Sequence, residues 1–222
     1  MTFKAPTEFH VEKDYKDIIK GLNSYLIIME LIQSDIPVTE NLDFQKAFRS
    51  FYIPSSKDEA FISNFFAIME QFRKGGIPTY RETLEKIYEE TGEVHYSFSS
   101  KLLHTLNPES PILDSIVMNW LGYSIQNKKT IYKGKKTAKQ IEEKEKQDAK
   151  NRIDYYCAVY DDVCSEYKKH LQNTPKIRLA LSRFNEVYPQ FKNISDVKKL
   201  DTLLWRLKDE KRPSILDYFA LT

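Results

Sequence analysis

The sequence predicts an all-α protein, and three observations lead to this prediction. Apolar residues recur at intervals of three and four along most of the chain, which is the period of a helix that buries one face. Clusters of proline, glycine and serine separate these stretches where helices are expected to end. No segment of five or more residues alternates apolar and polar residues as a half-buried strand does.

The amino-terminal part of the chain contains four expected helices. The first is the most strongly periodic, and it should end before Pro37 because proline disfavours helical geometry in the residue that precedes it. Ser56 is expected to cap the third helix, and Thr79 and Glu82 have the spacing of a capping box for the fourth. The expected ranges are 11–32, 43–51, about 57–74 and 80–90.

Five further helices are expected in the second half of the chain. Ser97 or Ser99 opens a helix that runs to about Leu106, and a proline-rich turn follows it. Asp114 is placed to open the next helix, and Ser195 and Asp196 the last one. The ranges expected after the turn are 115–121, about 153–171, 175–188 and a final helix from 195.

Length and charge suggest one globular unit over residues 1–222, with room for two small lobes and an exposed charged segment at about 127–152. That segment has ten basic residues against four acidic ones, a net charge of +6 within a chain whose formal charge is +2. Almost no large apolar residue lies between Tyr132 and Ile153. We therefore expect an exposed loop that runs into a solvated helix.

Several classes of protein are disfavoured. The two cysteines, Cys157 and Cys164, cannot supply the four thiolates of an iron–sulfur cluster, and no Cys/His spacing typical of zinc is present. No glycine-rich phosphate loop occurs. The amino-terminal stretch lacks the apolar run of a signal peptide, and the longest apolar stretch, 25–32, is too short to span a membrane. We expect a cytoplasmic protein that contacts no membrane and uses no metal ion or other cofactor.

The stretch SFSSKLLHTLNPESPILDSIVMNW, residues 97–120, places Lys101 and Asp114 on either side of the proline-rich turn. One interpretation is structural, because aspartate is a favoured N-cap and lysine is usually solvated. The other is a chemical pair of amine and carboxylate. His104 lies one helical turn after Lys101, where it is either a packed, hydrogen-bonded side chain or a groove residue.

This stretch resembles part of the helix–hairpin–helix DNA glycosylases, the family with the 8-oxoguanine glycosylase fold. SFSSK followed by LLHTL is similar to that family's Gly-Val-Gly-x-Lys segment and the helix after it, and PILDSIVMNWL is similar to its turn into the helix with the catalytic aspartate. The resemblance implies a two-lobed helical protein that binds duplex DNA and excises a damaged or modified base. It also implies that Lys101 is the nucleophile and that Asp114 stabilises positive charge on the sugar.

The same resemblance suggests residues that contact DNA. Ser97, Ser99 and Ser100 occupy the hairpin region, with His104 beside the groove. Five lysines after the Asp114 helix are either phosphate contacts or simply solvated: Lys128, Lys129, Lys133, Lys135 and Lys136. Ser97 and Ser99 stand where the family has glycines. Two alternatives therefore stay open: a catalytically inactive DNA-binding module on the same scaffold, and a protein-interaction module without a nucleic-acid role.

Overall fold

The chain is helical in every element of the computed structural model, which describes residues 11–53, 57–126 and 137–206. The all-α prediction is confirmed for these residues. The helices are α1 (Val11–Leu31), α2 (Leu42–Tyr52), α3 (Glu59–Gly75), α4 (Tyr80–Thr91), α5 (Tyr96–Leu106), α6 (Ser115–Trp120), α7 (Ala138–Asn173), α8 (Pro175–Val187), a short 3-10 helix (Pro189–Phe191) and α9 (Asp196–Arg206).

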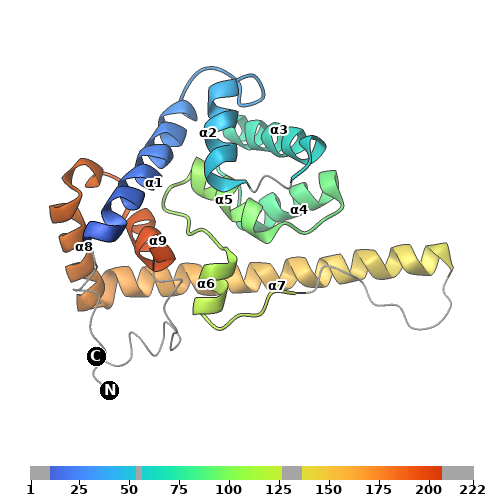
Figure 1. The fold of residues 1–222 in the computed structure, drawn as a ribbon. Helices are drawn as coiled ribbons and strands as arrows, with labels where there is room; N and C mark the ends of the chain where they lie inside the picture. The colour runs from blue at the N-terminus through green and yellow to red at the C-terminus, as the bar shows by residue number, and fades with distance from the viewer. Residues whose placement is uncertain (1–10, 54–56, 127–136, 207–222) are drawn as a thin grey trace.

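The long helix α7 runs along one side of the molecule, and α4, α8 and α9 pack against it (Figure 1). The helices α1, α8 and α9 gather near its carboxyl end, whereas α2 to α5 form a second group. The amino-terminal turns of α7, from Ala138 to Asp148, are mostly exposed, and Ala149 is the first buried residue of this helix. No described helix has both the length and the apolar character needed to cross a bilayer.

Most helix ends follow local signals in the sequence. Thr79 and Glu82 form the expected capping box, and Gly92 ends α4 with a φ of 72°, a left-handed conformation that glycine adopts without strain. Asp114 caps α6, as expected. Asp58 caps α3, whereas the expected cap, Ser56, lies outside the described residues.

The start of α5 differs from the expectation. The helix begins at Tyr96 with His95 as its N-cap residue, so Ser97 and Ser99 lie inside the helix and do not open it. Ser99 and Ser100 both bond to carbonyls of the preceding turn. The Ser99 hydroxyl donates to the His95 carbonyl at 3.0 Å, and the Ser100 hydroxyl lies 3.0 Å from the Ser97 carbonyl. Serine is accommodated within a helix when its hydroxyl finds such a partner.

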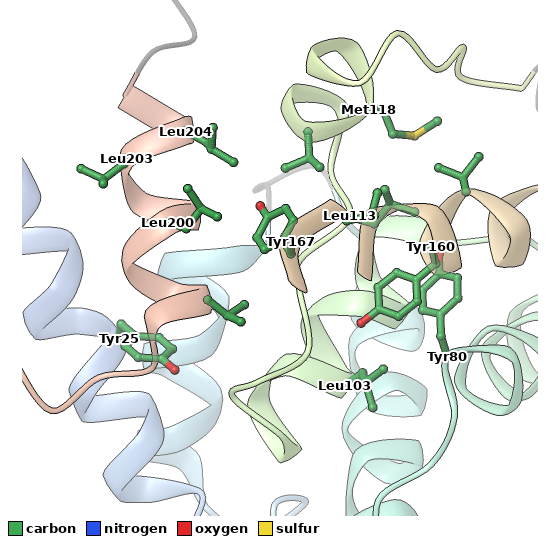
Figure 2. Close-up of a cluster of buried hydrophobic side chains, with 14 of the residues drawn as sticks. Tyr25, Tyr80, Leu103, Leu113, Met118, Tyr160, Tyr167, Leu200, Leu203 and Leu204 are labelled. Atoms are coloured by element: carbon green, nitrogen blue, oxygen red, sulfur yellow. The ribbon is translucent and has the colours of Figure 1, made fainter. Parts of the chain in front are cut away.

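Two apolar clusters form the interior, and α5 contributes to both. Phe98 and Leu102 belong to a cluster with α2 and α3 that is rich in phenylalanine. Leu103, on another face of α5, belongs to the cluster with α7, α8 and α9, in which the rings of Tyr80 and Tyr160 stack 4.0 Å apart (Figure 2). The position of α5 therefore determines how the two groups of helices meet.

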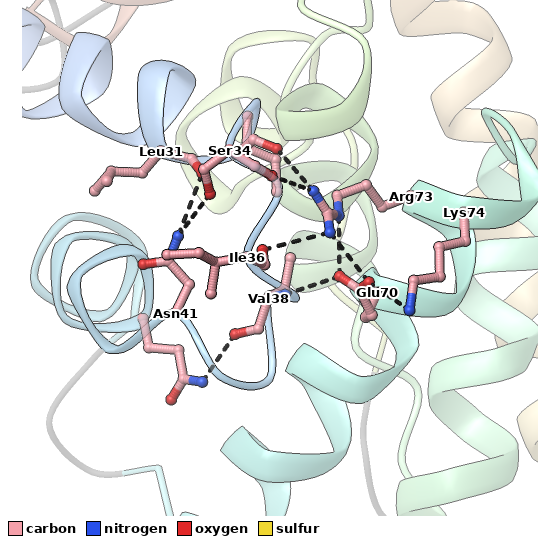
Figure 3. Close-up of polar contacts among 10 residues, drawn as sticks. Leu31, Ser34, Ile36, Val38, Asn41, Glu70, Arg73 and Lys74 are labelled. Atoms are coloured by element: carbon pink, nitrogen blue, oxygen red, sulfur yellow. Dashed lines mark hydrogen bonds and ion pairs between the residues drawn. The ribbon is translucent and has the colours of Figure 1, made fainter.

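Glu70 ties the loop between α1 and α2 to helix α3. Its carboxylate accepts a hydrogen bond from the Val38 N–H at 2.8 Å and forms ion pairs with Arg73 and Lys74 at 2.9 and 3.1 Å (Figure 3). Arg73 also donates to the Ser34 carbonyl at 2.7 Å. Burial by itself raises the pKa of Glu70, but the hydrogen bonds from these donors outweigh it and hold the pKa at about 2.

The substitution Glu70→Gln is expected to lower the free energy of unfolding by about 2 kcal/mol near neutral pH, because it leaves Arg73 without its counter-charge. The folded pKa of Glu70 lies below the unfolded value of about 4.3, so this contribution is complete above that pH and disappears as the pH falls toward 2. Urea unfolding of both proteins, followed by circular dichroism across this range, measures the difference.

Glu85→Gln is the matched control, because Glu85 forms an exposed ion pair with Arg81 on α4. Its expected effect is below about 0.5 kcal/mol. A difference between wild type and Glu70→Gln that stays constant down to pH 2 would show that the Glu70 carboxylate does not act as described.

Candidate functional site

The turn between α5 and α6, residues 107–114, is partly buried: Pro111, Ile112 and Leu113 are buried and Glu109 is exposed, so its inner backbone groups need partners within the protein. Side chains from α5, from α7 and from the start of α9 supply these partners. The pairs are Ser195 Oγ with the Pro108 carbonyl at 2.8 Å, His104 Nδ1 with the Ser110 carbonyl at 2.7 Å, the Tyr160 hydroxyl with the Pro111 carbonyl at 3.1 Å, and the Leu113 N–H with Ser100 Oγ at 2.9 Å.

The turn delivers Asp114 to the start of α6. Asp114 Oδ1 accepts hydrogen bonds from the Ile116 and Val117 N–H groups, both at 2.9 Å, as an N-cap does. Burial raises the pKa of Asp114 above its ordinary value, and the hydrogen bonds of the cap oppose this rise. The carboxylate is thus partly buried and held in one orientation.

Lys101 reaches from α5 to the carboxyl end of α2. Its Nζ donates to the Tyr52 carbonyl at 3.1 Å, which is one of the carbonyls that a helix end leaves unpaired. The ammonium also lies 5.2 Å from the centre of the Phe98 ring. Burial lowers the pKa of Lys101, and the nearby Asp114 carboxylate opposes this effect. Lys101 and Asp114 therefore act on each other electrostatically, although within the described chain they form no direct ion pair.

Helix α9 adds two charged residues to this region. Lys198 Nζ and Asp201 Oδ2 form an ion pair at 2.8 Å, and both side chains are buried, with exposures of 6% and 8%. Both also act on the pKa of Lys101. We refer to Lys101, Asp114, Lys198 and Asp201 together as the charged centre.

Lys198 and Asp201 were not singled out by the reasoning from the sequence. Oppositely charged residues three positions apart are common on exposed helix faces, and nothing local distinguishes a buried pair from an exposed one. The one available signal was the position of both residues beside the apolar face that includes Val197, Leu200 and Leu204.

Buried polar atoms without a hydrogen-bond partner in the described part of the chain surround the charged centre: the hydroxyls of Tyr52 and Tyr167 and Nε2 of His104. Because a carbonyl only accepts, His104 Nδ1 carries the proton and Nε2 is a free acceptor. Burial is the main cause that lowers the pKa of His104 to about 4, so the ring is neutral near pH 7. Asp201 acts electrostatically on all three side chains.

The structure describes four of the nine predicted DNA-contacting residues: Ser97, Ser99, Ser100 and His104. Ser99, Ser100 and His104 are fully buried and bond within the protein, so they present no surface to a phosphate, and their role here is to hold α5 and the turn. Ser97 is half-buried near the start of α5. The five lysines between 128 and 136 lie outside the described residues.

The fold and site define a helical protein with a partly buried charged centre at the junction of α2, α5, α6 and α9. In the described ranges, no group of three or more histidine, cysteine, aspartate or glutamate side chains gathers in a way that could hold a metal ion. No family model, no curated protein sequence and no solved structure matches the chain.

Ser100→Ala is expected to lower the free energy of unfolding by about 1–3 kcal/mol, because it leaves the buried Leu113 N–H without an acceptor. Chemical denaturation followed by tryptophan fluorescence measures this. Ser97→Ala, on the same helix but half-buried, is the control and should change stability by less than about 0.5 kcal/mol. Equal effects of the two substitutions would argue against the role of Ser100 in holding the turn.

Proposed function

We propose that the protein is a DNA glycosylase-like protein that binds duplex DNA and excises a damaged or modified base. Lys101 is the nucleophile and Asp114 the stabilising carboxylate. The observation that chiefly supports the proposal is that Lys101 of α5 and Asp114, the N-cap of α6, are both partly buried and act on each other electrostatically, although they lie thirteen positions apart. The resemblance of residues 97–121 to the helix–hairpin–helix glycosylases supports the choice of DNA as substrate.

The chemistry requires an amine that is not fully protonated. Burial lowers the pKa of Lys101, which increases the fraction of free amine near neutral pH. The amine lone pair attacks the sugar carbon of an extruded nucleotide as the N-glycosidic bond breaks, and the base leaves with the electron pair and takes up a proton. Loss of the amine protons and opening of the sugar ring then form the Schiff base. The Asp114 carboxylate stabilises the positive charge that develops on the sugar.

A second candidate function is a catalytically inactive DNA-binding or interaction module, and one observation favours it. Both groups of the pair already have structural partners: Lys101 bonds to the end of α2, and Asp114 caps α6. In such a module these bonds are the whole role of the two residues.

Borohydride trapping on duplexes with a panel of damaged bases tests the catalytic proposal. We expect wild type to form a covalent adduct and Lys101→Gln to form none. Asp114→Asn keeps a good N-cap but removes the charge, so excision should fall by about 10²- to 10³-fold while the fold is retained. Lys46→Gln, at an exposed position of α2, serves as the control and should behave as wild type. If wild type forms no adduct with any duplex of the panel, the catalytic proposal is overturned and the inactive module remains as the candidate function.

Fluorescence anisotropy with a labelled duplex at several salt concentrations tests DNA binding separately from catalysis. Asp114→Asn should bind as wild type does. Replacing Lys128, Lys129, Lys133, Lys135 and Lys136 by glutamine should weaken binding and reduce the salt slope by about 0.9 for each phosphate that the protein no longer neutralises. A wild-type protein that binds no duplex at low salt would exclude a DNA partner and favour the interaction module.

A further inference from the structure

We propose that Lys198 and Asp201 are a positioning pair for Lys101, in which Lys198 holds and neutralises Asp201 so that Asp201 does not fix the Lys101 amine as an ammonium. The inference rests on the proposed role of Lys101 as nucleophile. It assigns a role to two residues of α9 that have none in the proposed excision reaction.

The geometry places both lysines against the last turn of α2. Lys101 Nζ bonds to the Tyr52 carbonyl, and Lys198 Nζ lies 5.6 Å from the ring of the adjacent residue, Phe51. Lys198 is held there by Asp201, with 2.8 Å between Nζ and Oδ2. The centres of the Phe51 and Tyr52 rings lie 4.6 Å apart, and Lys101 Nζ lies 5.8 Å from the Tyr52 ring, so the two ammonium groups border one pair of rings. Asp201 is bonded to the lysine that is not the proposed nucleophile.

The charges in this centre act on Lys101 in opposite directions. After burial, which has the largest effect and lowers the pKa of Lys101, the carboxylates of Asp114 and Asp201 raise it and the ammonium of Lys198 lowers it. Removing Lys198 leaves Asp201 unopposed and favours the protonated form of Lys101. Removing Asp201 leaves Lys198 unopposed and favours the free amine.

Four further titratable side chains near the centre are uncharged near neutral pH. They are Tyr25 of α1, Tyr52 of α2, His104 of α5 and Tyr167 of α7. Burial raises the pKa of each phenol and lowers the pKa of His104 to about 4. Lys57, 5.4 Å from the Phe98 ring that Lys101 also faces, adds a positive charge that substitutions in α9 leave unchanged.

The test measures the ionisation of Lys101 directly and without DNA. Brief acetylation with acetic anhydride between pH 6 and pH 10, read residue by residue by mass spectrometry against a reference peptide, gives the pH midpoint of Lys101 labelling. Lys198→Met should raise this midpoint and reduce labelling near pH 7.5 by about three- to tenfold. Asp201→Asn should lower the midpoint and increase labelling by a similar factor.

Two further variants separate charge from packing. Lys198→Met combined with Asp201→Asn removes both charges and should return the midpoint close to that of wild type. Lys198→Arg keeps the positive charge and should leave the midpoint unchanged. Lys199→Met is the matched control. Lys199 is also buried and forms an ion pair with Asp196 at 2.9 Å, but it is not among the charges that shift the pKa of Lys101.

The opposite signs make the inference falsifiable even when stability changes. Unfolding exposes every lysine alike. If the pair had a purely structural role, Lys198→Met and Asp201→Asn would therefore shift the midpoint of Lys101 labelling in the same direction, and that result overturns the proposal. An unchanged midpoint in Lys198→Met overturns it as well. If Lys198→Met does not fold, the Asp201→Asn variant tests the proposal alone. A midpoint of Lys101 labelling that does not fall in this variant overturns the proposal. If the two variants shift the midpoint in opposite directions but the wild-type protein excises no base, the proposed function is refuted and the effect of the pair on Lys101 stands.

Discussion

The structure depends on how the partly buried turn at residues 107–114 is held. An irregular segment in the interior is stable only when its backbone groups find partners, and here side chains from α5, α7 and the start of α9 provide them. These bonds join elements that lie far apart in the sequence. Because the same turn leads from α5 into the N-cap of α6, the bonds also fix the distance between Lys101 and Asp114.

The charged centre follows from this arrangement. An ammonium satisfies the carboxyl end of α2, a carboxylate satisfies the amino end of α6, and the ion pair of α9 is buried. Buried charges are costly, and replacing such a pair by apolar residues is often neutral or stabilising. In the charged centre, Lys198 and Asp201 are buried as such a pair, whereas Lys101 and Asp114 are partly buried and each bonds to a helix end.

Local patterns predicted the helices well, and they failed where the decisive contact was distant. The box of Thr79 and Glu82 and the cap of Asp114 are contacts within three residues, and both were predicted. The start of α5 was placed too late, because Ser97 and Ser99 look like caps in the sequence but lie inside the helix. The role of Ser100 depends on Leu113, thirteen residues away, and no local rule reveals it.

By itself, the sequence determined that this protein is helical, where most of its helices end, and that Lys101 and Asp114 flank a proline-rich turn. These properties depend on side-chain period and on contacts between near neighbours. Only the tertiary structure decided that the two residues interact, that Lys198 and Asp201 join them, and that Ser99, Ser100 and His104 face inward. Burial and electrostatic coupling arise from packing between helices that are distant in the chain, so they do not exist until those helices meet.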